Sequence, residues 1–481
     1  MSKLQARKTN NHTTLHDKIS YTCKVNAKAM LEWNRLLSPK RLGLEDEEMR
    51  AQDVRTQFQR DYDRIIFSSP FRRLQNKTQV FPLPGSVFVH NRLTHSLEVA
   101  SVGRSLGNMV AHGLVERNVD VSPNLLDSIG TIVSSACLAH DLGNPPFGHS
   151  GEKAISRYFK EIDTNNLSSF LSEKQLTDLT NFEGNANTLR LLTHHFTGRR
   201  KGGFALTYAT IGTLLKYPCT STDLLQGKSP YQKYGIFQSE IPILQQVASE
   251  LGLTSYQGSS TVYARHPLVF LMEAADDICY QIVDLEDAHR LGTISTKEAK
   301  DLMFAFFDPT DDREALQDLN DSLRDISDEN EQVVILRSRT INKLITDCVN
   351  VFWKKYDEIM NSCYYTSLVE SLEGTPKIAM TNLAKVATEK IYNAREVLEI
   401  QVAGHRILSE LLQEFVTASL RGDSTLYTSQ LIRLLPVQLK IEEDNAFPRI
   451  FSVVDFISGM TDVYSLEMYR KIKGISFSVI R

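Results

Sequence analysis

Apolar residues recur with helical periodicity along most of the chain. Between Leu125 and Leu142, apolar side chains and one histidine are spaced three and four residues apart, which predicts one buried helix face. The positions on this face are Ile129, Ile132, Val133, Ala136, Cys137 and His140. A histidine on an apolar face is more often a satisfied core residue than a ligand, so its neighbours decide its meaning.

Three further segments have the pattern of long helices. Residues 266–291 combine a long apolar face with Pro267 near the first turn and Gly292 after the last, which are typical start and stop signals. Residues 331–358 and 380–420 also repeat their apolar positions every three to four residues. These segments predict a mainly α fold with a helical C-terminal part.

Strand signals are few. The clearest is QVFPLPGSVFV at residues 79–89, where two short apolar runs flank Pro84 and Gly85 and predict a small β-hairpin. Residues 308–332 are acidic and polar, which suits a surface helix or a mobile crossing, with a solvated face as the simpler interpretation.

Composition narrows the class of protein. The 481 residues are 42% hydrophobic and carry a net charge of −4, so no overall basicity points to nucleic acid. The six cysteines have no paired spacing, which favours reduced thiols over a disulfide or zinc framework. The polar N-terminus has no signal-peptide pattern and no run suits a membrane span, so we expect a cytoplasmic protein without membrane contact.

Two acidic residues lie inside the apolar helix predicted over residues 266–291. Burying an unpaired carboxylate costs several kcal/mol, so Asp276 and Asp277 need partners or a metal. Asp276, Tyr280 and Asp284 follow at i, i+4 and i+8 and share a helix face. For a single buried aspartate a salt bridge would be the simpler explanation, and the stripe favours a site.

The stretch LAHDLGNPPFGHSGE gathers more titratable groups at the end of a core helix. His140 and Asp141 are adjacent, and we expect Gly143 to end the helix as a C-cap. The two prolines that follow fix a turn, which predicts that His149 and Glu152 return to the same region.

A metal site is the hypothesis that unites these residues. His95 begins another amphipathic helix, three residues after Arg92. Two imidazoles and two carboxylates, from His95, His140, Asp141 and Asp276, suit manganese, magnesium, iron, cobalt or nickel better than thiolate-loving metals. Such a set leaves coordination positions for water and a phosphate oxygen.

The order of these residues resembles a known superfamily. His95, the His140-Asp141 pair and Asp276 reproduce the H…HD…D order of HD-domain metal-dependent phosphohydrolases. Longer strings between Asp61 and Asp462 resemble the deoxyguanosinetriphosphate triphosphohydrolase family. They are DYDRIIFSSPFRRLQNKTQVFPL, NRLTHSLEVA, AHDLGNPPFGHSGE, NFEGNA, KYGIFQSE, ADDICY and DFISGMTD.

The resemblance implies a fold and an activity. It implies a helical N-terminal extension (1–60), an HD-domain catalytic core (61–300) and a helical C-terminal region (301–481) that completes the site and oligomer contacts. Family members hydrolyse a deoxynucleoside triphosphate to the deoxynucleoside and triphosphate, with Mn²⁺ or Mg²⁺ on the four ligands. They are usually oligomers, hexamers by resemblance, and a dNTP or single-stranded DNA is a candidate effector.

The resemblance also implies roles for individual residues. His149 matches the catalytic histidine and Glu152 the acid that orients it, with the direction of proton transfer left open. The phosphate-binding positions are Arg92, Lys216, Tyr217 and Lys233, and the sugar-binding positions are Gln79, Val80, Tyr280 and Asp284. Val80 would crowd the ribose 2′ position, which explains a preference for deoxyribose.

Departures and alternatives mark what the resemblance leaves open. Asn144 stands where a second branch of HD triphosphohydrolases has histidine, and Val463 where many relatives have arginine. No residue identifies guanine, so a broad-specificity or dNTP-activated enzyme is the first alternative. Another HD nucleotidase or phosphodiesterase, or a non-catalytic regulator that binds dNTPs or nucleic acid, are the others. The short basic run at residues 199–201 could touch single-stranded DNA, although such runs are more often only solvated.

Overall fold

The fold is helical throughout the described part of the chain. The computed structural model describes residues 30–45, 54–81, 89–162, 167, 169–421, 425–440 and 445–475. Within these ranges β pairing is limited to isolated bridges, and the predicted mainly α fold is confirmed. No helix in these ranges is both long and apolar enough to cross a membrane.

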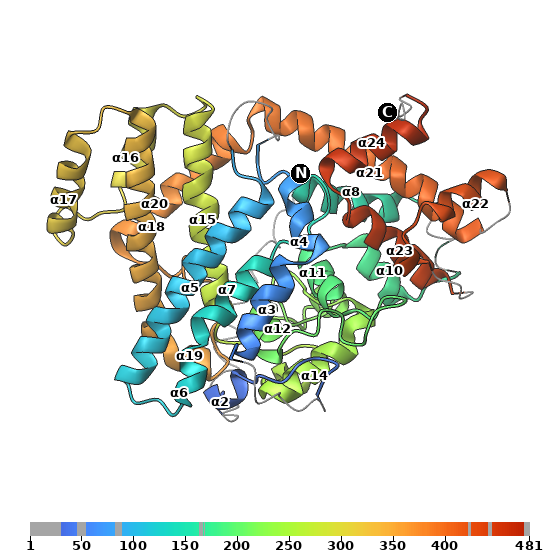
Figure 1. The fold of residues 1–481 in the computed structure, drawn as a ribbon, viewed down its shortest axis with the longest axis horizontal. Helices are drawn as coiled ribbons and strands as arrows, with labels where there is room; N and C mark the ends of the chain where they lie inside the picture. Colours follow the sequence, from blue (N-terminus) through green and yellow to red (C-terminus); the bar gives the residue numbers. More distant parts are fainter. Residues whose placement is uncertain are drawn as a thin grey trace, which may run out of the picture.

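The helices fall into a central group and a C-terminal group (Figure 1). The first part of the chain contains α2 (Trp33–Leu36), α3 (Gln57–Ile66), α4 (Ser69–Arg73), η1 (Leu74–Asn76), α5 (Arg92–Glu116), α6 (Pro123–Leu126), α7 (Ile129–Ala139), α8 (Gly148–Glu161), α10 (Glu173–Thr180), α11 (Gly184–Thr193), α12 (Tyr208–Leu214), α13 (Ser221–Leu225), η2 (Gln238–Glu240), α14 (Ile241–Leu251) and η3 (Tyr256–Gly258). The remainder contains α15 (Val269–Arg290), α16 (Thr296–Phe304), α17 (Arg313–Arg324), α18 (Glu329–Lys354), α19 (Tyr356–Met360), α20 (Gly374–Val386), the π-helix η4 (Ala387–Ile391), α21 (Arg395–Arg421), α22 (Leu426–Arg433), η6 (Val437–Leu439), α23 (Ala446–Ser458) and α24 (Asp462–Ile472).

Two apolar cores hold these helices together. The central core is built on α5, α7 and α15, which pack against one another and against α3, α12 and α18. The C-terminal core lies between α8, α10, α21 and α23. Figure 1 shows α16–α18 and α20 at one end of the molecule, α10, α22 and α23 at the other, and α5 and α7 between them. α21 contributes Val397 to the central core and Leu408 to the C-terminal core, so this helix bridges the two.

Local signals explain where the main helices begin and end. The Asn91 side chain accepts from the Thr94 amide, and Thr94 returns a bond to the Asn91 amide, which forms a capping box at the start of α5. α15 ends at Arg290, two residues before Gly292, whose φ of +74° suits glycine. Both ends agree with the sequence prediction to within a few residues.

Several predicted elements are corrected in detail. The helix expected over 125–142 is two helices, α6 and α7, and α7 ends at Ala139. The one expected over 380–420 is split into α20, η4 and α21, because the backbone widens to a π-helix before Tyr392. The acidic stretch at 308–332 contains the surface helix α17.

The predicted hairpin at residues 79–89 is not supported. The chain does return on itself there, because Thr78 and Asn91 form an antiparallel bridge. Residues 79–81 and 89 are not in strands, and residues 82–88 lie outside the described residues. A single bridge with two prolines in the connecting loop gives too few ladder hydrogen bonds for a stable hairpin.

Most of the predicted N-terminal extension also lies outside the described residues. Leu31, Trp33, Leu36 and Leu42 are buried in the central core, and α3 runs across the boundary expected at residue 60. The described N-terminal segment is therefore packed on the core, and the division into three regions stays a prediction.

Four cysteines are free thiols as expected, namely Cys137, Cys219, Cys279 and Cys348. Cys363 is disulfide-bonded, so the expectation of reduced thiols is wrong for this residue. A pairing between cysteines distant in sequence leaves no spacing signal that the sequence could reveal.

A buried histidine ties the start of α5 to the end of α15. The His90 ring contacts Asp287 at 2.8 Å and Glu98 at 3.2 Å, and its amide donates to Asp287. Burial alone lowers the pKa of His90, but the two carboxylates outweigh it and raise the pKa to about 10. Arg337 also lies 4.0 Å from Glu98. This junction fixes the approach of α5 to α15.

The first prediction is that His90→Gln destabilises the protein in a pH-dependent manner. The folded pKa lies above the unfolded value of about 6.5, so the contribution to stability is complete below pH ~6.5 and is lost as the pH approaches ~10. Leaving Asp287 buried without its cation should cost roughly 3 kcal/mol near pH 6. Thermal unfolding should show a large gap from wild type near pH 6 that shrinks toward pH 10.

The control for this prediction is His112→Gln. His112 is on the same helix and 3.5 Å from Glu116, but both side chains are exposed. Its gap should be small at every pH, and a His90→Gln gap that does not change with pH would refute the ion-pair explanation.

Candidate functional site

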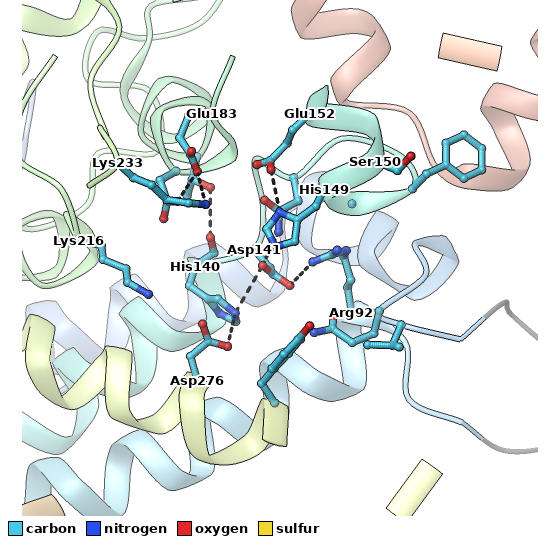
Figure 2. Close-up of a pocket in the computed structure, with 18 of the residues that line it drawn as sticks. Arg92, His140, Asp141, His149, Ser150, Glu152, Glu183, Lys216, Lys233 and Asp276 are labelled. Atoms are coloured by element: carbon cyan, nitrogen blue, oxygen red, sulfur yellow. Dashed lines mark hydrogen bonds and ion pairs between the residues drawn. The ribbon is translucent and has the colours of Figure 1, made fainter. Parts of the chain in front are cut away.

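One pocket lies where the two cores meet. It has a volume of about 590 Å³ and is lined from α5, the end of α7, α8, α15 and α21 and by loops between them. Its lining includes all the predicted site residues except His95 and Asp284. Figure 2 shows the labelled side chains converging from these elements.

Three of the four predicted metal ligands come together at the floor of this pocket. The Nε2 atoms of His95 and His140 lie 3.2 and 3.4 Å from Oδ1 of Asp276. One ligand atom from each residue lies within 4.8 Å of the others. Helices α5, α7 and α15 pack side by side, which brings the three side chains to one point.

The chemistry of this group fits a divalent cation. Nδ1 of His140 donates to the Cys137 carbonyl at 2.6 Å, which leaves the buried Nε2 without a hydrogen-bond partner. Burial disfavours the imidazolium, but Asp141 and Asp276 outweigh it and raise the pKa of His140 to about 9. The negative field that favours a proton here equally favours a metal ion.

Asp141, the fourth predicted ligand, lies alongside the group and has other partners. Its Oδ2 accepts from Arg92 at 2.6 Å, and its Oδ1 accepts from Asn144 at 2.5 Å and lies 3.5 Å from Nε2 of His140. Burial raises the pKa of Asp141, but the Arg92 guanidinium outweighs it and holds this pKa below the ordinary value. The carboxylate is therefore ionised, as a ligand must be.

The expected histidine–glutamate pair is formed at the start of α8. His149 Nδ1 and Glu152 Oε2 are 2.7 Å apart, and the second oxygen of Glu152 accepts from the Gly184 amide at 2.8 Å. Glu152 is buried, which raises its pKa, but the contact with His149 outweighs burial and lowers it. An ionised, fixed carboxylate orients the largely exposed imidazole, whose Nε2 stays available.

Gly143 has a different role from the predicted one. α7 ends four residues earlier, and Gly143 does not have a left-handed backbone. A Cβ on Gly143 would lie 2.1 Å from the Thr188 amide, so glycine is required because the backbone of α11 approaches closely.

The predicted phosphate-binding residues line the pocket, and each cation has a carboxylate partner. The pairs are Arg92 with Asp141 at 2.6 Å, Lys216 with Glu273 at 3.3 Å and Lys233 with Glu183 at 3.2 Å. Tyr217 lies beside Lys216, whose Nζ is 5.7 Å from the tyrosine ring centroid. Paired cations are held in place without ligand, and an anion would compete with the carboxylates for them.

The predicted sugar-binding residues are only partly brought together. Gln79, Val80 and Tyr280 line the pocket, and Oε1 of Gln79 is buried without a hydrogen-bond partner. Asp284 does not reach the pocket, because the Tyr392 hydroxyl donates to it at 3.0 Å and the Tyr392 ring stacks on Tyr280. Eight residues along a helix rotate the side chain by about 80° from Asp276, so Tyr392 can come between.

Sequence reasoning missed several residues of this site. Tyr392 lies on the pocket wall and comes from the C-terminal part of the chain. Asn144 and Glu183 hold Asp141 and Lys233, and both belong to strings that carried the resemblance. Those strings were the only signal, because a partner's role depends on contacts between distant segments.

Comparison with known proteins agrees with this geometry. The family model of the HD domain matches residues 92–203, and that of the phosphohydrolase-associated domain matches residues 372–471. A deoxyguanosinetriphosphate triphosphohydrolase-like protein of Synechocystis sp. is 39% identical, over 93% of this chain and 100% of its own length. A like-named protein of Pseudomonas aeruginosa is 38% identical, over 93% and 99%.

A more distant relative carries the name without the suffix. The deoxyguanosinetriphosphate triphosphohydrolase of Yersinia enterocolitica is 30% identical, over 86% of this chain and 93% of its own length. Both the matched HD domain and the relatives extend over the helices that build the pocket. The chain therefore belongs to the deoxyguanosinetriphosphate triphosphohydrolase-like family and is a hydrolase of the HD-domain class.

Proposed function

We propose that this chain hydrolyses dGTP to deoxyguanosine and intact triphosphate. The observation that carries the proposal is that one pocket combines a histidine–aspartate group suited to a divalent metal, an oriented histidine–glutamate pair and three cations. Its volume of about 590 Å³ is in the range of small-molecule sites. The names of the relatives supply the base, because no pocket residue singles out guanine.

In this proposal the metal is held by His95, His140 and Asp276, with Asp141 as the fourth ligand. Mn²⁺ or Mg²⁺ is expected, and iron, cobalt or nickel also suit these donors. When bound, the ion would polarise a phosphate oxygen and the attacking water.

The chain's own groups then position the substrate and move a proton. Lys216, Tyr217 and Lys233 bind the triphosphate, with Arg92 beside the metal ligands. Water adds to the α-phosphorus while the bond from phosphorus to the 5′ oxygen breaks. Nε2 of His149 is the atom placed to exchange a proton with the water or with the leaving 5′ oxygen, because Glu152 occupies Nδ1.

The sugar is bound on the opposite wall. The unpartnered Oε1 of Gln79 can accept from the 3′-hydroxyl, and Tyr280 offers a ring face supported by Tyr392. Asp284 orients the Tyr392 hydroxyl, so direct contact with the 3′-hydroxyl would require Tyr392 to move.

Product analysis tests the proposed function. Purified protein with Mn²⁺ should convert dGTP to deoxyguanosine and triphosphate and leave GTP unchanged. Monophosphate with pyrophosphate would favour another HD phosphohydrolase activity instead. Turnover only with mixed dNTPs, or only with single-stranded DNA, would identify the effector; hexamer assembly likewise stays a prediction, which light scattering tests.

The second prediction concerns Val80. Val80→Ala removes two methyl groups from the expected 2′ position, and we expect kcat/KM for GTP relative to dGTP to rise roughly 10-fold. Val397→Ala removes the same methyl groups from the α21 side of the pocket and should leave this ratio unchanged. Competition assays with both nucleotides measure the ratio, and an unchanged ratio in Val80→Ala would refute exclusion at the 2′ position.

A further inference from the structure

Asp462 joins two loops of the pocket that are distant in sequence. Its Oδ2 accepts from the Thr78 amide at 2.8 Å, and its Oδ1 accepts from the Phe147 amide at 3.0 Å. Asp462 is buried at the start of α24, in the C-terminal core region. Thr78 immediately precedes Gln79 and Val80, and Phe147 comes two residues before His149. One carboxylate thus connects the sugar wall to the catalytic turn.

A second buried side chain joins the same three segments. Nζ of Lys77 donates to the Asn144 carbonyl at 2.6 Å and to the Ser458 carbonyl at 3.0 Å. Charged groups facing this junction include Arg73 and Arg92 as well as Asp462. The junction therefore consists of residues 77–78, 144–147 and 458–462, held by Lys77 and Asp462.

Phe147 needs this support because its backbone is strained. It has φ +62° and ψ 18°, the left-handed region that a bulky residue rarely adopts. It is also the N-cap of α8 and gives no side-chain hydrogen bond to the helix. The conformation that presents His149 is therefore held from outside α8.

α21 supplies the other part of this support. The Phe147 ring fills a notch at Gly404, where a Cβ would lie only 2.4 Å from Cγ of the ring. The Ser150 hydroxyl donates to the Gln401 carbonyl at 2.8 Å, one turn earlier on the same helix. The C-terminal part of the chain therefore grips the turn both through its backbone and through its side chain.

We infer that Asp462 and Gly404 are positioning residues that set the geometry of His149 relative to the sugar wall by holding the Phe147 turn. The inference rests on the proposed function for its catalytic meaning. It assigns to the phosphohydrolase-associated region, residues 372–471, a direct part in presenting the catalytic histidine. A displacement of about 1 Å in a reacting group can cost on the order of 100-fold in rate.

The test compares variants in two backgrounds. Asp462→Asn keeps the shape but can accept through only one oxygen, so one of the two amides loses its partner. We expect kcat for dGTP to fall about 10- to 100-fold with little change in KM, and Gly404→Ala to act in the same direction. In a His149→Gln background, Asp462→Asn should cost little further, because the group that it positions is absent.

Two controls separate positioning from loss of structure. Glu467→Gln removes one charge from the exposed face of the same helix and should leave activity unchanged. Metal content and thermal unfolding of Asp462→Asn should match an intact fold. An equal loss of kcat in the wild-type and His149→Gln backgrounds would overturn the inference, since a structural defect does not depend on His149.

The imidazole NMR resonances of His149, assigned through His149→Gln, provide a readout that needs no turnover. We expect them to move in Asp462→Asn and in Gly404→Ala but not in Glu467→Gln. If the wild type hydrolyses no dNTP, the proposed function fails while these spectra still decide the positioning role. Unmoved resonances in both variants would overturn the inference even if the enzyme is active.

Discussion

Replacing Asp276 with Asn is expected to remove the bound divalent metal and to lower dGTP turnover by about 1,000-fold or more. Asp276 is the point that both histidines approach, so its carboxylate is the centre of the candidate metal group. A neutral amide there removes the charge that offsets a cation in a buried site. His140→Gln should act in the same direction, because it removes the Nε2 donor.

The experiment measures metal content and activity on the same samples. After loading with Mn²⁺ and dialysis, wild type should retain about one more metal equivalent per chain than Asp276→Asn. Asp277→Asn is the matched control, since Asp277 is the next residue on α15 but faces a separate pocket with Glu273 and Gln281. Full activity in an Asp276→Asn protein that holds no metal would remove the proposed mechanism.

The other large effect is expected from His149→Gln, which should lower kcat by roughly 100- to 10,000-fold. Its imidazole is the titratable group placed to exchange a proton at the scissile bond, and glutamine fills similar space without that capacity. Glu152→Gln should cause a smaller loss, on the order of 10- to 100-fold, because it removes the group that fixes the imidazole and not the imidazole itself.

The two mechanisms separate in the metal analysis. His149→Gln should retain metal like wild type, because His149 is not among the grouped ligands, whereas Asp276→Asn should not. The surface pair of His112 and Glu116 provides the control, and His112→Gln should leave kcat unchanged. Wild-type kcat in His149→Gln would show that the proton passes through another group.

Local sequence patterns predicted the helices that carry the metal ligands. The apolar face of α7 and the stop signals around α15 depend on neighbours a few residues apart, so periodicity found them. The order His95, His140-Asp141 and Asp276 pointed to one site, and the fold brings three of these residues together. Helix packing then needed only to place α5, α7 and α15 side by side.

Predictions failed where a contact with a distant segment decided the outcome. Gly143 resembles a C-cap by position, yet its role is to let the Thr188 backbone approach. Asp284 shares a helix face with Asp276 and Tyr280 in the sequence, but Tyr392 comes between it and the pocket. Neither effect has a signal within one helical turn of the residue concerned.

The sequence by itself determined the helical class, the main helices and the order of the residues that identify the HD-domain family. These features follow from short-range periodicity and from motifs read along the chain. Only the tertiary structure decided that Asp462 joins the loops at Thr78 and Phe147 and that Tyr392 covers Asp284. Those contacts span up to 384 positions in the chain and depend on how the two cores pack together, which no local pattern encodes.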